Sequence, residues 1–444
     1  MRKLFGGRVV IRAPQIMVLG FAGVILAGAL LLSLPVSAAD GTGASFLDAL
    51  FTATTSVCVT GLVVQDTGTY WSGFGQGVIL LLIQVGGLGV ITVAASFSLA
   101  AGRKIDLFQR QTLQEAVAAP QLGGIVRLTG FLLKATFLME FLGALLLAPV
   151  FVRDFGLSRG LWMAVFHGIS AFCNAGLDLT GTVAPFSSLT AYRGSVLVNG
   201  TIMALIVAGG LGFLTWEDIR SHGLAFRKYR MQTKVILTAT AGLIFIPAAL
   251  FFLLEYRDLP LKDRVLASLF QSVTARTAGF NTADLGAMSE SGQLAMIFLM
   301  LIGGSPGSTA GGMKTTTFAV LLACGAGVFR KGDDTQLFGR RVAQEAVSTA
   351  VTLACLYIGL SVGCAMVISR LEGLPLLTCL YETASAVATV GLSQGITPGL
   401  GTASRWMLMG LMFLGRVGGL TLVYAASSGR KQVGKLPLEK ITVG

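Results

Sequence analysis

Charged side chains are scarce in this sequence, because Asp, Glu, Lys and Arg together make up only 12% of the 444 residues. A soluble domain carries roughly 25% charged residues, so this composition excludes an ordinary soluble protein. Hydrophobic residues make up 54% of the chain. Runs such as 15–34 and 78–101 reach the ~20 apolar residues that are needed to cross a bilayer. The sequence therefore predicts an all-α polytopic membrane protein in contact with the lipid bilayer.

Histidine and paired cysteine are also nearly absent. The chain has two histidines and six cysteines, and no two cysteines form a CxxC pair. Metal sites of the usual spacing need such clusters, so we expect no metal site and no cofactor. Cys58, Cys173 or His167 could serve an intramembrane enzyme, but no recurring pair of base and nucleophile supports that class. We predict that the chain is not an enzyme.

Basic residues outnumber acidic ones, giving a net charge of +12. Such a charge could indicate a nucleic-acid partner, but most of the basic residues are gathered in five clusters between the apolar runs. The clusters span 2–12, 103–134, 220–234, 330–341 and 430–440. The positive-inside rule places clusters of this kind on the cytoplasmic side of a membrane. We therefore expect no nucleic-acid partner, but a multi-pass protein of the plasma (inner) membrane with both termini in the cytoplasm.

The five clusters divide the chain into four units whose interiors match one another. The units are 1–102, 103–220, 221–330 and 331–444. Each unit contains a short stretch that ends with a glycine followed by Leu or Phe. The stretches are FTATTSVCVTGL (51–62), FHGISAFCNAGL (166–177), LFQSVTARTAGF (269–280) and YETASAVATVGL (381–392). Their near-equal spacing indicates a fourfold internal repeat.

Long apolar helices are expected on both sides of every short stretch. The first helices are predicted over 15–35, 128–152, 232–254 and 342–369. The second helices are predicted over 75–100, 194–216, 293–329 and 404–427. The stretches between them hold segments of about 10–12 residues, which are too short to span a bilayer and suit re-entrant half-helices. Each unit is thus predicted to be a helix, a pore loop and a second helix, arranged around a central pore with fourfold pseudo-symmetry like that of a potassium channel.

The second helices share a glycine patch, and one unit departs from it. The patch is VGGLGVIT (85–92), AGGLGFLT (208–215) and VGGLTLVY (417–424). Small residues let membrane helices pack closely, so we expect these three helices to be continuous. The third unit has GGSPGSTAGGMKTTT (303–317) instead, and its glycines and proline should open the helix into an intramembrane loop. This loop is a poor phosphate loop, because Met313 separates glycine from lysine and no strand precedes it.

Irregular backbone at membrane depth must be buried in protein or line a water-filled cavity. Four equivalent loops around one axis would form a ring of carbonyl oxygens, which can replace the hydration shell of a cation. Glycine permits the backbone conformations with positive φ that such a ring needs. Carboxylates are absent from these loops, which favours a monovalent ion. The predicted filter residues are Val59, Thr60, Gly61, Asn174, Ala175, Gly176, Thr277, Ala278, Gly279, Thr389, Val390 and Gly391.

Taken together, the motifs SVCVTGL, FCNAGL, TARTAGFNT and GSTAGGMKT resemble those of the Trk/Ktr/HKT superfamily of potassium transporters. The resemblance extends over about 15–428 and is closest to the Ktr membrane subunit (KtrB), because the first pore unit begins without a preceding helix pair. It implies channel-like uptake of K⁺, often dependent on Na⁺, by a homodimer with one pore per subunit. It also implies control by a cytoplasmic nucleotide-binding subunit (RCK-type, KtrA-like). The basic loops at 227–230 and 330–341 are candidate docking sites for that subunit, or ordinary topology determinants that contact anionic lipid.

The loop at 303–317 is expected to lie beneath the filter, where it would obstruct ion flow. Its small residues would let it move, so we predict that it is a gate. Arg416 could be an electrostatic barrier, a donor to the loop carbonyls or a purely structural group, and the resemblance implies a part in the gate. Lys314 is expected to support the loop. The candidate gate residues are Gly303, Gly304, Ser305, Gly307, Ser308, Thr309, Gly311, Gly312, Lys314 and Arg416.

Arg276 and Glu382 are the predicted filter supports. Arg276 should lie behind the filter and donate to loop carbonyls, with Glu382 as a possible partner; the alternative is a solvated arginine at the pore mouth. Gln84, Glu140 and Asn199 are interpreted mainly as interhelical hydrogen-bonding groups. A secondary transporter with alternating access remains the competing function. It would predict inverted repeats, whereas here the basic clusters recur after every unit.

Overall fold

A computed structural model describes residues 13–100, 107–117, 123–330, 334–419 and 421–422. Four of its helices are each long and apolar enough to cross a membrane. They are α1 (Ala13–Leu32), α6 (Ile125–Phe155), α10 (Met231–Leu254) and α14 (Gln344–Glu372). These are the predicted first helices of the four units, confirmed to within a few residues at most ends. The basic clusters at 2–12 and 430–440, and the end of the predicted helix 404–427, lie outside the described residues.

A shorter helix follows each of these four and packs against it. The shorter helices are α2 (Phe46–Cys58), α7 (Leu157–Cys173), α11 (Leu261–Thr274) and α15 (Leu376–Val387). The predicted short segment before each shared glycine is therefore present, although α7 is longer than expected. Ser45 caps the first of them by accepting a hydrogen bond from the backbone N–H of Asp48 at 3.1 Å, which satisfies a free donor of the first turn.

The second helices are interrupted, which corrects the prediction that three of them are continuous. In the first unit α3 (Gly73–Leu88) and α4 (Val90–Ala100) meet at an angle of 95°. In the second unit α8 (Val196–Gly210) and α9 (Phe213–His222) also meet at 95°. In the fourth unit α16 (Thr402–Val417) ends at a glycine. The glycines at the breaks have φ of 85°, 86° and 94° and are Gly89, Gly212 and Gly418. This left-handed backbone is strained for other residues.

The glycines before these breaks lie against the short helices. A Cβ on Gly86, Gly209 or Gly415 would lie 2.1, 1.9 and 2.1 Å from a carbonyl oxygen near the end of a short helix. The packing role predicted for the glycine patches is thus present, but the predicted alignment of the fourth unit is wrong. The counterpart of 86–89 is 415–418, so Arg416 occupies the place that glycine has in the first two units.

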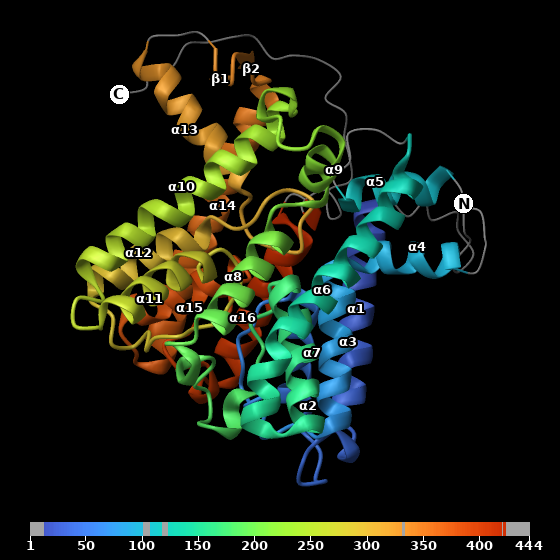
Figure 1. Cartoon of the computed structure of the whole chain (residues 1–444), viewed down its shortest axis with the longest axis vertical. Coiled ribbons are helices and arrows are strands. Elements are labelled where there is room, and N and C mark those ends of the chain that lie inside the picture. The colour runs from blue at the N-terminus through green and yellow to red at the C-terminus, as the bar shows by residue number, and fades with distance from the viewer. Residues whose placement is uncertain (1–12, 101–106, 118–122, 331–333, 420, 423–444) are drawn as a thin grey trace.

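The third unit differs from the other three as predicted, because a loop separates α12 (Glu290–Leu301) from α13 (Thr315–Phe329). The loop covers 302–314, slightly less than the predicted 303–317. Beyond α13 a two-stranded hairpin pairs β1 (Gln336–Leu337) with β2 (Arg340–Arg341). Helix α5 (Leu107–Val117) lies beside α4 at the same end of the molecule (Figure 1). Short 3₁₀ turns occur at Pro35–Ser37, Thr180–Thr182, Thr190–Tyr192, Phe226–Lys228 and Thr397–Gly399.

The four units form a closed ring of helix contacts. Helix α3 contacts α7, α8 contacts α11, α12 contacts α15, and α16 contacts α2. In every case the second helix of one unit packs against the short helix of the next, and the last unit returns to the first. This arrangement brings the ends of the four short helices together in the interior.

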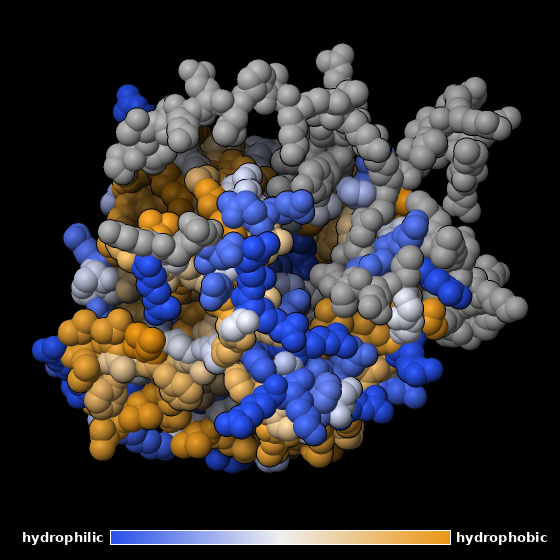
Figure 2. Space-filling view, turned by 90° about the horizontal axis from the view of Figure 1, so that it is seen from above, coloured by the Kyte–Doolittle hydropathy of each residue, from blue (hydrophilic) through white to orange (hydrophobic). Residues whose placement is uncertain are grey.

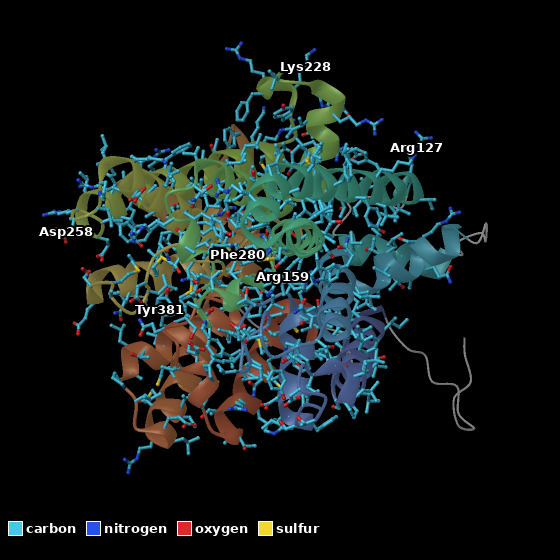
Figure 3. The ribbon with its side chains drawn as sticks, turned by 60° about the horizontal axis from the view of Figure 1, so that its bottom comes forward. Arg127, Arg159, Lys228, Asp258, Phe280 and Tyr381 are labelled. Carbon is cyan, nitrogen blue, oxygen red and sulfur yellow. The ribbon has the colours of Figure 1, made fainter. Side chains whose placement is uncertain are left out.

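Much of the outer surface is apolar, as expected for a chain that lies in a membrane. On the face seen from above, apolar side chains border a more hydrophilic centre (Figure 2). Many large apolar residues are exposed on the long helices, for example Leu145, Phe245 and Met366. Phe280 and Tyr381 are fully buried, whereas Arg127, Lys228 and Asp258 are placed toward the outside (Figure 3).

Candidate functional site

The chain takes the same turn just before each of the four shared glycines. The residue two positions before each shared glycine is left-handed, with φ of 56°, 61°, 67° and 53° at Val59, Asn174, Thr277 and Thr389. The glycines themselves have φ of 97°, 65°, 83° and 90° at Gly61, Gly176, Gly279 and Gly391. Left-handed valine and threonine are uncommon, and finding them at equivalent positions in three units indicates that the surroundings fix this shape.

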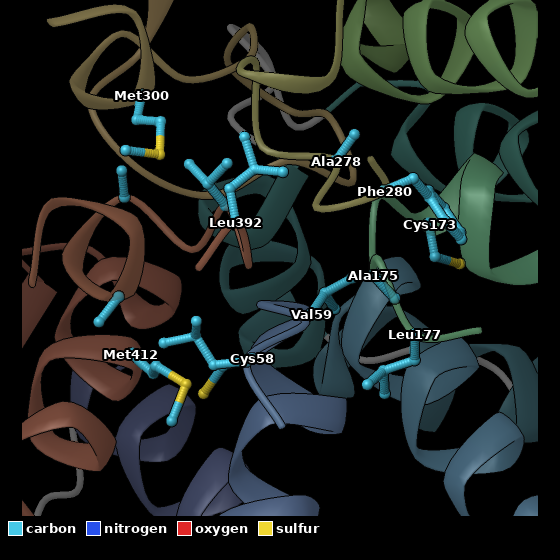
Figure 4. Packing of buried hydrophobic residues seen from close by; sticks show 14 of the residues in the cluster. Cys58, Val59, Cys173, Ala175, Leu177, Ala278, Phe280, Met300, Leu392 and Met412 are labelled. Atoms are coloured by element: carbon cyan, nitrogen blue, oxygen red, sulfur yellow. The ribbon is translucent and has the colours of Figure 1, made fainter. Parts of the chain in front are cut away.

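The four glycines meet one another. A Cβ on Gly61 would lie 2.6 Å from the carbonyl oxygen of Ala175, and one on Gly176 would lie 2.6 Å from that of Ala278. The corresponding distances from Gly279 to Val390 and from Gly391 to Thr60 are 2.6 and 2.0 Å. Each glycine thus faces the carbonyl of the residue before the next glycine, and the fourth closes on the first. We call these residues the glycine ring; Figure 4 shows its surroundings, with Val59, Ala175 and Ala278 on converging segments.

Hydroxyl groups inside the short helices hydrogen-bond to the backbone at and just after the ring glycines. Thr55 Oγ1 accepts from the N–H of Gly61 at 3.0 Å, and Ser385 Oγ accepts from the N–H of Gly391 at 3.0 Å. Ser170 Oγ instead donates to the carbonyl of Leu177 at 2.7 Å. The sequence comparison missed these groups, although a hydroxyl six positions before the glycine in three of the stretches was a visible signal.

A cavity of about 270 Å³ opens on one side of the glycine ring and is lined by all four glycines. Three carboxylates, Asp66, Asp178 and Asp284, line the same cavity, and none of them was predicted. Asp66 accepts from the backbone N–H groups of Thr69 at 3.0 Å and Phe186 at 2.8 Å, so it joins loops of the first and second units. Burial raises the pKa of Asp178 to about 6, against hydrogen bonds from Thr180 that lower it.

The loop 302–314 lies against the other side of the ring. A Cβ on Gly311 would meet Thr389 Oγ1 at 2.1 Å, and one on Gly303 would lie 3.2 Å from Thr277 Cγ2. Two of the left-handed residues before the ring glycines are therefore in contact with the loop. The small residues predicted for this segment are what allow the close approach.

The loop is anchored to the break between α8 and α9. The N–H of Ser305 donates to the carbonyl of Gly210 at 2.9 Å, and the N–H of Phe213 donates to the carbonyl of Gly307 at 2.9 Å. Thr309 Oγ1 donates to the carbonyl of Phe172, at the end of α7, at 3.0 Å. The broken second helix of unit two thus supplies backbone partners that a continuous helix would not have.

Arg416 joins three units through backbone carbonyls. Its guanidinium donates to the carbonyl of Thr309 in the loop and to those of Gly86 and Gly87 at the end of α3. Of the three roles left open for this arginine, the structure contains the hydrogen bond to the loop. Lys314 Nζ donates to the carbonyls of Ala310 at 2.8 Å and Gly311 at 3.3 Å, so it is bonded to the loop, and its role as a support stays a prediction.

A family model described as a cation transport protein, TrkH, matches residues 24–432. The chain belongs to the TrkH family of cation transport proteins. The potassium/sodium uptake protein NtpJ of Enterococcus hirae is 38% identical, over 97% of this chain and 97% of that protein. The Ktr system potassium uptake protein B of Bacillus subtilis is 39% identical, over 93% and 92%. The predicted resemblance to the Trk/Ktr group is therefore confirmed, and membership in this family places the chain among transporters rather than enzymes.

A solved structure of a TrkH family member supports the fold. The crystal structure of the potassium transporter TrkH from Vibrio parahaemolyticus matches with a TM-score of 0.75, covering 96% of this chain and 87% of that one. The sequences are only 18% identical, so this likeness concerns the fold alone.

Within this TrkH-family chain Arg276 does not pair with Glu382, which was its possible partner. Arg276 is buried and donates to Thr240 Oγ1 of α10 at 3.3 Å rather than to a loop carbonyl. Glu382 accepts from Thr397 Oγ1 in the loop after the fourth glycine. Arg276 lies two residues after the end of α11 and Glu382 lies in α15, and the two side chains have different partners. Arg276 therefore joins the segment after α11 to α10.

The other polar groups in apolar segments give one confirmation and one correction. Gln84 Nε2 of α3 donates to Glu140 Oε1 of α6 at 3.0 Å, so this pair is interhelical as expected. Asn199 donates to the carbonyls of Tyr192 at 2.8 Å and Ser195 at 2.7 Å. It therefore fastens the start of its own helix instead of bridging two helices, because the preceding 3₁₀ turn folds back over it.

Proposed function

We propose that this chain carries potassium ions across the cell membrane through a channel-like pore whose selective part is the glycine ring. The observation that carries the proposal is the mutual approach of the four glycines and the carbonyls that precede them. The relatives named for potassium uptake support potassium as the ion. The closed sequence of helix contacts supports four pore-loop units around one fourfold pseudo-symmetric path.

The chemistry of the ring favours a monovalent cation. Backbone carbonyl oxygens can replace the water around a potassium ion, and the C-terminal ends of four short helices add partial negative charge. Neutral carbonyl oxygens without a carboxylate are a poor site for a divalent ion. The three carboxylates of the 270 Å³ cavity lie at its approach and would raise the local concentration of cations.

We propose further that the loop 302–314 is the gate and that Arg416 holds the loop in its closed position. The loop contacts the ring segments on the side opposite the carboxylates, where it would obstruct an ion leaving the ring. Gly303 N–H donates to the carbonyl of Met313 at 2.7 Å, so the two ends of the loop are adjacent. A variant shortened between them can therefore still close the chain.

Shortening the loop tests the gate separately from the pore. Deletion of 306–310 should raise potassium flux in a protein that still folds, because the obstruction is removed. Unchanged or lower flux in a folded deletion variant would count against the gate. Growth of potassium-uptake-deficient cells at low external potassium tests the transport function itself, and failure of the unmodified chain to restore growth would contradict it.

The remaining features are proposed from the resemblance and from the names of the relatives. They are a homodimer, activation by sodium, a cytoplasmic nucleotide-binding subunit of the RCK type, a location in the plasma membrane and cytoplasmic termini. The repeated direction of the helix contacts supports a pore over an alternating-access carrier, which would be built from inverted repeats. Flux that saturates like that of a carrier would favour the latter.

A further inference from the structure

A large apolar groove lies outside the proposed ion path, between α10, α12 and α13. Its volume is about 870 Å³, and its walls include Val235 and Phe251 of α10, Phe298 of α12, and Phe318 and Leu322 of α13. None of the ring or loop residues lines it. Figure 1 shows α13 beside α10, where it leaves the body of the molecule.

The dimensions of the groove match a hydrocarbon chain. It follows α10 from Val235 to Phe251, which is about 24 Å at a rise of 1.5 Å per residue. This length fits within the ~30 Å hydrocarbon core of a bilayer. Because α10 has the length and composition of a membrane span, the groove opens toward lipid. Apart from the end near Arg330, the walls are lined almost entirely by apolar side chains and glycine.

One end of the groove carries a cation. Arg330 follows α13 directly and lines this end together with Asp334. The carboxylate of Asp334 is already paired, because Arg341 Nη1 lies 3.3 Å from its Oδ2. Within the described part of the chain Arg330 has no ion pair, so this end has excess positive charge. An arginine guanidinium is well suited to a phosphate group.

We propose that this groove binds an anionic phospholipid, with an acyl chain between α10, α12 and α13 and the headgroup phosphate at Arg330. Both charge and shape argue for this occupant over a second copy of the chain, because an acyl chain fits a long apolar groove and a phosphate matches Arg330, which has no ion pair among the described residues. A zwitterionic lipid would fill the same groove without using the charge.

The site has a bearing on transport because α12 and α13 are the helices on either side of the loop 302–314. The rings of Phe298 and Phe318, one from each helix, are 6.0 Å apart at the groove wall. An acyl chain packed against both holds the two helices at a fixed separation and so fixes the ends of the loop. This consequence, though not the binding, rests on the proposal that the loop is the gate.

Fluorescence quenching by brominated lipid measures the binding directly. The variant Phe318→Trp places a new indole in the groove, and its emission is taken as the difference from the unmodified protein in identical vesicles. In phosphatidylcholine vesicles, brominated phosphatidylglycerol should quench this emission at a roughly fivefold lower mole fraction than brominated phosphatidylcholine. This factor is the effect of one basic residue near an anionic lipid. Adding Arg330→Gln should abolish the preference.

A matched control separates the groove from the general lipid surface. Leu145 on α6 is 58% exposed and lies outside the groove. Both lipids should therefore quench the variant Leu145→Trp equally. If Phe318→Trp misfolds, Leu322→Trp reports on the same groove. Equal quenching of the groove variant by both lipids would overturn the proposal that the groove prefers an anionic lipid. Absence of quenching, together with a cross-linked dimer through Leu322→Cys, would show that a second copy covers the groove.

Flux measurements keep the two proposals apart. Raising the anionic fraction of the vesicles should change potassium flux, and Arg330→Gln should flatten that dependence. If the quenching preference is present and the loop deletion leaves flux unchanged, the gate fails and the lipid site stands. If the deletion raises flux and the preference is absent, the lipid site fails and the gate stands.

Discussion

The guanidinium of Arg416 donates a hydrogen bond to the backbone carbonyl of Thr309, which joins the last helix of the fourth unit to the loop that interrupts the third. The same side chain reaches the carbonyls of Gly86 and Gly87 in the first unit. Three units are thus tied at one point beneath the glycine ring. Because glycine occupies the equivalent position in the first two units, only the fourth can supply this link.

Removing the Arg416 guanidinium should release the loop. Hydrogen bonds to charged groups contribute about 1.5–3 kcal/mol each, so Arg416→Gln should shift the equilibrium toward the conducting state by roughly tenfold or more. Potassium flux into liposomes is the measurement. Arg405→Gln is the control on the same helix. Arg405 Nη1 lies 2.7 Å from Asp48 Oδ1 and makes this ion pair away from the loop. Higher flux in the Arg405 variant alone, or lower flux in the Arg416 variant, would contradict the fastening role.

A methyl group at the fourth ring glycine should block the pore. Gly391 has φ of 90° and its Cβ would lie 2.0 Å from the carbonyl oxygen of Thr60. Clash and backbone strain together predict that Gly391→Ala lowers potassium flux by at least about tenfold. Gly395→Ala is a matched control in the same loop, because Gly395 has φ of 86° but nothing within 4 Å of its Cβ. Equal loss of flux in both variants would mean that strain, not the close approach, is responsible.

Acidic external solution should reduce uptake through Asp178. Its pKa of about 6 lies above the ordinary value of 3.8, so the carboxylate is charged above pH 6 and neutral below it. Loss of the Asp178 charge at the cavity removes ~1 kcal/mol of attraction, and flux at low potassium should fall roughly fivefold as the pH drops through 6. Asp178→Asn should give the low flux at every pH, and persistence of the step in this variant would assign it elsewhere.

The sign of the same shift also predicts stability. A raised pKa means that the folded state binds the proton more tightly than the unfolded state, so folding stability contributed by this group increases as the pH falls from above 6 toward 3.8. Asp178→Asn, which resembles the protonated acid, should therefore unfold at a temperature no lower than that of the unmodified protein at neutral pH. A clearly lower unfolding temperature would mean that the charged form is the one the fold requires.

The contact between Gln84 and Glu140 should be needed for stability rather than for transport. Glu140→Leu leaves the Gln84 amide without its partner inside the bundle, at a cost of about 1–3 kcal/mol. Glu140→Gln can still accept from Gln84 Nε2 and can also donate to Gln84 Oε1, which has no partner among the described groups. Thermal unfolding in detergent should therefore place Glu140→Gln at or above the unmodified protein and Glu140→Leu below it. The reverse order would require the carboxylate charge itself.

Much of the architecture can be predicted because long apolar runs and glycines at near-equal spacing are visible in the sequence. The first helices, the short helices and the loop in the third unit were all predicted from apolar run length and from matching stretches. The bends at Gly89 and Gly212 were not, because a GGLG sequence in an apolar helix is compatible with both close packing and a break. Only the tertiary contact with a short helix decides between them.

The site was predicted less completely, for a related reason. The meeting of ring glycines such as Gly61 and the contact of Lys314 with the loop follow from residue type and position. The partner of Arg276 does not, because a side chain at the end of a short helix can turn toward several neighbours. Asp66 and Asp178 were overlooked because they lie after the repeated stretch, in loops that differ between units. Their shared cavity arises only when the loops fold together.

The central claim is that the glycine ring selects potassium, and paired flux measurements test it most directly. Purified protein in liposomes should carry potassium down its gradient much faster than sodium under matched gradients. Gly391→Ala should lose this potassium flux while Gly395→Ala keeps it. Equal flux of the two ions through the unmodified protein, or undiminished potassium flux through the Gly391 variant, would contradict the account.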